Sequence, residues 1–196
     1  MSIDAPYVMV VAGGTASGKT TIVGRFVERT GAAHISHDRY YFDVPNPRGH
    51  DFDHPSALDT DMLVQNVAEL KAGGVAQLPV YEFATHSRTH AVETMSPSSL
   101  IVVEGILVLA DPRIVALADL TVFVDAPETV RFERRLKRDM AERGRTEASV
   151  RSQYESTVKP NHDRFVEPSK HVASVVLDGT EDVDQNVDAL ISIVGI

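Results

Sequence analysis

The chain contains no cysteine. It therefore has no disulfide, no thiolate zinc site and no cysteine nucleophile. No apolar run in it is long enough to cross a bilayer. Residues 1–6 also lack the basic region and the long apolar stretch of a secretory signal peptide. From these absences we expect a cytoplasmic protein with no membrane partner.

Basic residues are also scarce, with 19 Lys and Arg against 28 Asp and Glu and a formal net charge of −9. Proteins that bind nucleic acid through its phosphates usually carry a basic face. Here a single basic cluster, residues 131–145, stands out in an otherwise acidic chain. Such a local cluster suits a small anion better than a long polyanion, so we expect no nucleic-acid partner.

The length of 196 residues and the 43% hydrophobic content predict a single folded domain, residues 1–196. Short apolar runs alternate along it with helical patterns, which predicts an α/β fold with a parallel sheet covered by helices on both faces. The predicted strands are 7–12, 33–36, 100–103, 120–124 and 174–177. Apart from a helix starting near residue 21, the predicted helices are 59–71, 127–140 and 182–194.

Two stretches interrupt this alternation. Residues 39–57 are rich in Pro, His, Asp and Tyr and are typical of a long functional loop. Residues 75–96 hold two short β-prone pieces and predict a hairpin-like insertion. We expect both near the carboxyl ends of the strands, where open α/β sheets bind their ligands.

The most specific motif is the octapeptide at residues 13–20, which has the pattern Gly, four residues, Gly-Lys-Thr. It lies between a predicted strand and a helix start, where such a loop points backbone N–H groups at phosphates. Lys19 would contact the outer phosphates and the Thr20 hydroxyl would ligate Mg²⁺. The predicted nucleotide-binding residues are Gly13, Gly14, Thr15, Ala16, Ser17, Gly18, Lys19, Thr20 and Thr21.

Two acidic residues follow predicted strands. Glu104 comes directly after 100–103 and is a candidate for holding Mg²⁺, the alternative being a surface carboxylate at a strand end. Asp38 follows 33–36 and could accept the proton of an attacking hydroxyl, or it could simply cap a turn.

Six arginines crowd one predicted helix and the turn after it: Arg131, Arg134, Arg135, Arg138, Arg143 and Arg145. The usual interpretation of such a run is a solvated basic helix. However, Gly144 separates two of the arginines as a hinge would, and arginine neutralises charge on a transferring phosphoryl group. These features favour an Arg-rich lid over about residues 138–148.

Candidate residues for binding a nucleoside lie in the two insertions. Asp53 could chelate ribose hydroxyls, and Tyr81, Phe83 and His86 could surround a base. The alternatives are a loop carboxylate and ordinary packing within a hairpin.

Nine short segments carry a more specific signal together. In chain order they are Asp38-Arg39-Tyr40-Tyr41, Phe52-Asp53-His54-Pro55, Leu78-Pro79-Val80-Tyr81, His86-Ser87-Arg88, Glu104-Gly105-Ile106-Leu107, Arg138-Asp139, Glu142-Arg143-Gly144-Arg145, Gln153-Tyr154 and Val158-Lys159-Pro160. In this order they resemble the motifs of the uridine kinase family of P-loop kinases, over about residues 7–180.

The resemblance implies a kinase that uses ATP and Mg²⁺ to phosphorylate the 5′-hydroxyl of uridine, and of cytidine. Lys19, Asp38, Arg138 and Arg143 would be catalytic, with Asp38 as the general base. Thr20, Glu104 and Asp38 would form the metal site, and Arg143 and Arg145 would close over the nucleotide. Asp53, Tyr81, Phe83, His86, Arg135 and Gln153 would bind the nucleoside. The family is typically oligomeric, often tetrameric, so a homo-oligomer is expected.

Two departures from the family pattern leave alternatives open. The loop between Tyr41 and Phe52 is shorter than usual, which leaves the choice of acceptor open. Leu177-Asp178-Gly179 stands where the family often has Pro-Arg-Gly near the donor base, which leaves ATP or GTP open as donor. The rival functions are a P-loop kinase of another small alcohol and a nucleotide-binding regulatory module without turnover.

Overall fold

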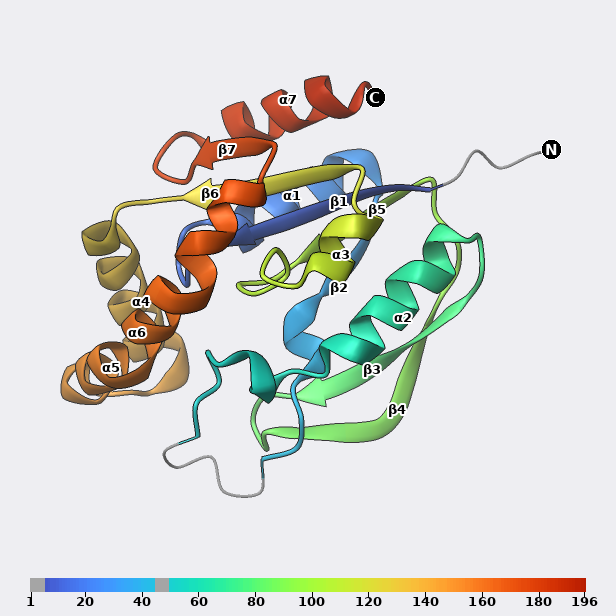
Figure 1. The fold of residues 1–196 in the computed structure, drawn as a ribbon. Helices are drawn as coiled ribbons and strands as arrows, with labels where there is room; N and C mark the ends of the chain where they lie inside the picture. Colours follow the sequence, from blue (N-terminus) through green and yellow to red (C-terminus); the bar gives the residue numbers. More distant parts are fainter. Residues whose placement is uncertain (1–5, 45–49) are drawn as a thin grey trace.

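A computed structural model describes residues 6–44 and 50–196. Its centre is a sheet of five parallel strands (Figure 1). In spatial order the strands are β2 (Ala33–Ser36), β5 (Leu100–Glu104), β1 (Tyr7–Gly13), β6 (Leu120–Asp125) and β7 (Val175–Asp178). They confirm the five predicted strands, whose ends differ from those observed by no more than one residue.

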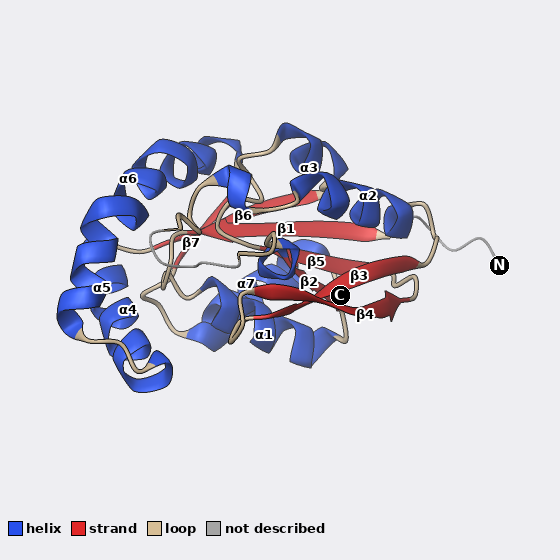
Figure 2. Cartoon of the chain, turned by 90° about the horizontal axis from the view of Figure 1, so that it is seen from below, coloured by secondary structure: helices blue, strands red, loops and turns tan. Residues whose placement is uncertain are grey.

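Helices cover both faces of the sheet, as predicted (Figure 2). One face packs on α1 (Lys19–Thr30) and α7 (Val183–Val194), and the other packs on α2 (Thr60–Lys71) and α3 (Pro112–Leu117). Side chains alternate along a strand, so Val8 and Val10 of β1 join the α2 side whereas Met9 and Val11 join the α1 side. Burial on both faces explains why the strands are continuous apolar runs.

The long predicted helices are all present, and two of them begin at a predicted acidic residue. The Asp59 carboxylate accepts a hydrogen bond from the Met62 N–H at 3.1 Å and caps α2, and Asp182 caps α7 in the same way. The pattern at 127–140 forms α4 (Glu128–Arg143). The short helices α3, α5 (Glu147–Gln153) and α6 (Lys159–Asn161) were not predicted, because one or two turns give too little periodicity.

The insertion at 75–96 is an antiparallel hairpin, as predicted. It consists of β3 (Ala76–Glu82) and β4 (Ser87–Met95), which form a separate two-stranded sheet beside α2 (Figure 1). Ala76 and Leu78 anchor β3 in the core, while most of β4 is exposed. Of the other insertion, 39–57, residues 45–49 lie outside the described residues.

Helices α4, α5 and α6 lie beyond the end of the sheet to which the β6 arrow points (Figure 1). Gly144 ends α4 with a left-handed φ of 60°, and the chain then turns into α5. From α5 the chain stays helical as far as Val172, before β7, with π-helical turns at Tyr154–Val158 and His162–Val166. Within residues 6–44 and 50–196, none of the helices has the length and apolar character needed to cross a bilayer.

Candidate active site

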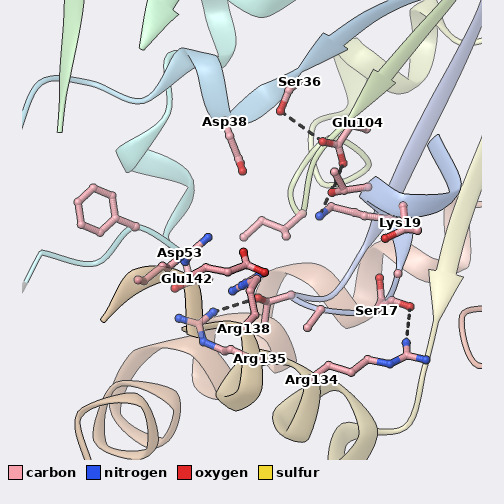
Figure 3. Close-up of a pocket in the computed structure, with 18 of the residues that line it drawn as sticks. Ser17, Lys19, Ser36, Asp38, Asp53, Glu104, Arg134, Arg135, Arg138 and Glu142 are labelled. Carbon is pink, nitrogen blue, oxygen red and sulfur yellow. Dashed lines mark hydrogen bonds and ion pairs between the residues drawn. The ribbon is translucent and has the colours of Figure 1, made fainter. Parts of the chain in front are cut away.

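A cavity of about 1310 Å³ lies at the carboxyl ends of the strands and brings the predicted segments together (Figure 3). Its walls come from the phosphate-binding loop, the segments after β2 and β5, the β3–β4 hairpin, and helices α4 and α5. The predicted residues that line it are Thr15, Ala16, Ser17, Gly18, Lys19, Thr20, Thr21, Asp38, Asp53, Tyr81, Phe83, His86, Glu104, Arg135, Arg138, Arg143, Arg145 and Gln153.

Gly13 and Gly14 are the two predicted residues that do not line the cavity. A Cβ atom on Gly13 would lie 2.5 Å from the Val124 carbonyl oxygen, and one on Gly14 would lie 2.8 Å from Nη1 of Arg131. The two glycines therefore let the loop pack closely against β6 and α4. In this structure they affect the shape of the loop without lining the cavity.

Arg134 joins the phosphate-binding loop to the segment after β7. Its Nη1 donates to the carbonyl oxygens of Gly179 at 2.9 Å and Ser17 at 3.3 Å (Figure 3). The sequence placed Arg134 only in the basic cluster, with no role of its own. The spacing of one helical turn between Arg134 and Arg138 does not indicate that Arg134 contacts the phosphate-binding loop and the segment after β7.

Glu104 is the centre of the metal-binding candidates. Its side chain is buried and accepts hydrogen bonds from Thr20 Oγ1 at 3.2 Å and Ser36 Oγ at 3.3 Å, while Lys19 Nζ lies 3.7 Å away. Ser36 was missed, although it pairs with Glu104 in the register of β2 and β5. Hydroxyl and carboxylate oxygens fit Mg²⁺, which usually takes one or two protein ligands and completes its shell with phosphates and water. The described residues contain no group of three or more His, Cys, Asp or Glu side chains that could hold a metal ion.

Asp38 lies in a 3₁₀ turn, His37–Tyr40, directly after β2, and faces the cavity (Figure 3). Burial raises the pKa of its carboxyl above the ordinary 3.8; the charge of Lys19 opposes this rise and that of Glu104 adds to it. A carboxylate with a raised pKa is a stronger base than an exposed one. Asp38 is therefore suited to accept a proton from a hydroxyl in the cavity.

Four arginines converge on Asp139, a residue that the sequence marked only as part of a family motif. Its carboxylate is fully buried and forms ion pairs with Arg138 at 2.8 Å, Arg145 at 3.2 Å, Arg143 at 3.4 Å and Arg135 at 3.7 Å. Burial by itself raises the pKa of Asp139, but the arginines outweigh burial and leave the pKa below 3.8. The predicted lid arginines are thus held together by one charge.

Arg135 and Gln153 form a second polar layer beside the loop. Arg135 is buried, donates to Thr15 Oγ1 and to Gln153 Oε1 at 3.0 Å each, and has a pKa that burial lowers from 12.5. Burial raises the pKa of nearby Asp53 to about 6, against the opposing charge of Arg135. Asp53 and Asp38 both line the cavity, and the charge of Asp38 adds to the rise at Asp53.

Aromatic side chains form the other end of the cavity. Ring centroids of Tyr81 and Phe83 lie 5.2 Å apart, and those of Phe52 and His86 lie 5.0 Å apart at an interplanar angle of 30°. The Tyr81 hydroxyl is buried and has no hydrogen-bond partner among residues 6–44 and 50–196. Phe52 and Tyr41 also line the cavity, although the sequence marked them only as parts of family motifs and gave them no role in the site.

Comparison with known proteins confirms the resemblance to the uridine kinase family. Residues 8–186 match the family described as "Phosphoribulokinase / Uridine kinase family". The chain is 44% identical over 182 residues to a uridine kinase of Chloroflexus aggregans, covering 89% of this chain and 87% of that protein. It is 39% identical over 183 residues to a uridine kinase of Streptococcus pyogenes, covering 89% and 88%.

Solved structures share the fold. A protein described as a "possible uridine kinase" from Bacillus stearothermophilus superimposes with a TM-score of 0.64 at 19% identity, covering 91% of each chain. Phosphoribulokinase from Rhodobacter spheroides has the same TM-score at 16% identity, covering 90% of this chain and 73% of that one. At these identities the likeness establishes the fold alone, whereas the sequence match over residues 8–186 establishes membership: the chain belongs to the phosphoribulokinase/uridine kinase family.

Proposed function

We propose that this protein is a uridine kinase that transfers the terminal phosphoryl group of a nucleoside triphosphate to the 5′-hydroxyl of uridine, and of cytidine. One observation carries the proposal. A single cavity joins a phosphate-binding loop, the carboxylates Asp38 and Asp53, and an aromatic-lined end. The uridine kinases at 39–44% identity over nearly nine-tenths of the chain support the same acceptor.

The end of the cavity formed by the phosphate-binding loop and the lid arginines, called here the donor end, supplies charge. The N–H groups of the loop and of the start of α1 would face the phosphates of a bound nucleotide, and Lys19 lines the same cavity. Thr20, Glu104 and Asp38 would hold Mg²⁺, which neutralises charge on the phosphate oxygens. Arg138, Arg143 and Arg145 would contact the transferring group from the lid, since arginine matches phosphate oxygens in geometry and charge.

The other end of the cavity, called here the acceptor end, contains Asp38, Asp53 and the aromatic side chains. It orients the nucleoside and supplies a base. Asp38 takes the proton of the 5′-hydroxyl as the oxygen attacks the terminal phosphorus. Asp53 accepts hydrogen bonds from the ribose hydroxyls, with Arg135 and Gln153 beside the sugar. Tyr81, Phe83 and His86 enclose the pyrimidine. A neutral histidine offers one donor and one acceptor nitrogen, so His86 can face the carbonyl of uracil or the amine of cytosine.

ATP is the proposed donor. Gly179, in the segment that differs from the family pattern, lines the cavity and accepts a hydrogen bond from Arg134, so GTP is the alternative donor to compare. We also propose a homo-oligomer, with a tetramer as its expected size, to be measured by light scattering during gel filtration.

The test is ADP release from MgATP with uridine, cytidine, adenosine, ribose or pantothenate, with the product identified by mass. We expect turnover with uridine and cytidine only, and a nucleoside 5′-monophosphate as product. Turnover with a different alcohol would replace the acceptor. ATP binding without turnover on any acceptor would favour the regulatory module instead.

A further inference from the structure

Arg88 connects three elements around the acceptor end without lining the cavity. It lies in β4, close in sequence to His86, and its side chain is about one-fifth exposed. Its guanidinium donates to the carbonyl oxygens of Tyr40 at 2.8 Å and Tyr41 at 2.9 Å, and to Asp59 Oδ2 at 3.1 Å. One planar group therefore satisfies two backbone carbonyls and one carboxylate.

The same contacts close a ring through Asp59, the residue that caps α2. The Asp59 N–H donates to the Tyr40 carbonyl at 2.8 Å, so this carbonyl accepts from both Asp59 and Arg88. The other carboxylate oxygen of Asp59 accepts from Met62 N–H. The start of α2, the segment after Asp38 and the hairpin are thus fixed to one another.

Each element that Arg88 joins carries residues of the acceptor end. The segment at 40–41 begins two residues after Asp38, and Tyr41 is part of the cavity wall. The hairpin carries Tyr81 and His86, and it belongs to a separate two-stranded sheet, so hydrogen bonds of the central sheet do not fix its position. The separation between the proposed general base and the aromatic wall therefore depends on the contacts that hold the hairpin against residues 40–44.

Other contacts also join the hairpin to this segment: Tyr40 and Leu78 belong to one buried core cluster, and the ring centroids of Tyr41 and Tyr81 lie 5.6 Å apart. Apolar packing of this kind is not directional, whereas the hydrogen bonds of Arg88 are. Arg39 pairs with Glu93, whose side chain is half exposed, so the pair is screened by solvent. The Val44 N–H donates to the His86 carbonyl at 3.0 Å, and Asp43 accepts from the Arg88 N–H at 2.5 Å. Within the described residues, the Arg88 guanidinium is the side-chain group of the hairpin that hydrogen-bonds to the backbone of Tyr40 and Tyr41, two and three residues after Asp38.

We propose that Arg88 is a positioning residue for the acceptor. By fixing the hairpin to the backbone after Asp38, it sets the distance between the Asp38 carboxylate and the wall that holds the base. A nucleoside seated against Tyr81 and His86 then presents its 5′-hydroxyl within reach of Asp38. The inference rests on the proposed function in that the acceptor is a nucleoside, and it goes beyond that function in assigning a role to a residue outside the cavity.

The principal test is Arg88→Lys, which keeps the positive charge but cannot make three directed contacts from one plane. We expect kcat/KM for uridine to fall by about 10- to 100-fold, because a displacement of about 1 Å at a reacting group has effects of this order. The KM for ATP and the slow hydrolysis of ATP without acceptor should stay within about twofold of the wild type, since the donor end is untouched.

Two further variants separate positioning from general weakening of the fold. Glu93→Gln removes the exposed ion pair between the same two elements and should change acceptor kinetics less than about twofold. Asp59→Asn keeps an oxygen to cap α2 but weakens the partner of Arg88, and we expect an intermediate loss with uridine. Asp59→Asn also provides a milder test should Arg88→Lys fold poorly.

Hydrogen exchange gives a readout that needs no acceptor. In Arg88→Lys we expect faster exchange in residues 38–44 and 82–90, with unchanged exchange in the loop at 13–20. Unchanged exchange in 38–44, or wild-type kcat/KM for uridine, would overturn the proposal. Equal losses in the donor and acceptor steps would also overturn it, because they would indicate a smaller folded fraction.

The outcomes distinguish this proposal from the function on which it rests. Failure of the wild-type enzyme to phosphorylate uridine refutes the proposed acceptor. The exchange experiment and the kinetics with the acceptor found in the panel then still decide the role of Arg88.

Discussion

The two ends of the cavity are built in different ways. The donor end comes from one continuous motif, residues 13–20, and from α4, whose arginines are held by the buried carboxylate of Asp139. The acceptor end is assembled from the segment after β2, residues 50–57 and the β3–β4 hairpin, which are far apart in sequence. Charge and backbone geometry organise the donor end, whereas a few side-chain contacts organise the acceptor end.

This difference has a consequence for substitutions. Changes at the donor end should disturb charge, and therefore both stability and nucleotide binding. Changes at the acceptor end should disturb orientation, and therefore the reaction with the nucleoside. Four substitutions test this expectation.

The largest effect is expected for Asp38→Asn, which removes the proposed base and leaves the shape of the site intact. We expect kcat with uridine to fall by about 10²- to 10⁴-fold, the usual contribution of a general base, with little change in the KM for ATP. Steady-state kinetics at pH 7.5 measures both. Asp61→Asn, which changes an exposed carboxylate on α2, is the matched control and should behave like the wild type. Full activity in Asp38→Asn would exclude Asp38 as the base.

The second effect concerns the donor end. Asp139→Asn leaves four arginines without their shared counter-charge, and loss of one partner from a buried ion-pair network typically costs about 3 kcal/mol. We expect a loss of this size in urea unfolding, together with a higher KM for ATP. A variant as stable as the wild type would show that the ion pairs are not what organises the lid arginines.

The third effect separates stability from function at Asp53. Its pKa of about 6 in the folded protein lies above the ordinary 3.8, so the ionised carboxylate costs folding free energy at neutral pH, up to about 3 kcal/mol. The free energy of unfolding of the wild type therefore rises as the pH falls from above 6 toward 4, and that of Asp53→Asn does not. At pH 7.5 the variant should therefore be more stable than the wild type while its KM for uridine rises about 10-fold or more.

Thermal unfolding of both proteins between pH 4.5 and 8 measures this difference. Equal curves would mean that Asp53 is solvated in the folded protein. A raised stability with an unchanged KM would mean that Asp53 does not contact the acceptor.

The smallest effect is expected for Phe83→Ala. Phe83 is 58% exposed, so its removal should change the free energy of unfolding by less than about 0.5 kcal/mol. Loss of one stacking surface should raise the KM for uridine by about three- to tenfold and leave the KM for ATP unchanged. Val92→Ala, at another exposed apolar position of the hairpin, is the control. Equal kinetics in the two variants would exclude Phe83 from the base-binding wall.

The same contrast explains what the sequence could predict. The five strands, the long helices and the hairpin follow from local periodicity and caps, as at Asp59 and Asp182. The phosphate-binding loop follows from a contiguous motif. These features depend on neighbours in sequence, so a sequence pattern is enough to find them.

Features that depend on distant partners were beyond the sequence. Asp139 is an exception, because its four arginines all lie within six residues of it; what the sequence does not show is that its carboxylate is fully buried among them. Ser36 and Glu104 meet because of strand register, and Phe52 reaches His86 only once the hairpin packs beside residues 50–57. Arg88 was noted as part of a motif, but its three acceptors lie between 29 and 48 residues away.

The most direct test of the account follows the phosphoryl group itself. The wild-type protein is incubated with uridine and MgATP labelled at the terminal phosphate, and the products are separated. The proposed function predicts label in uridine 5′-monophosphate in equal amount to the ADP formed. Label in inorganic phosphate, or label that stays in ATP in the presence of uridine, would contradict it.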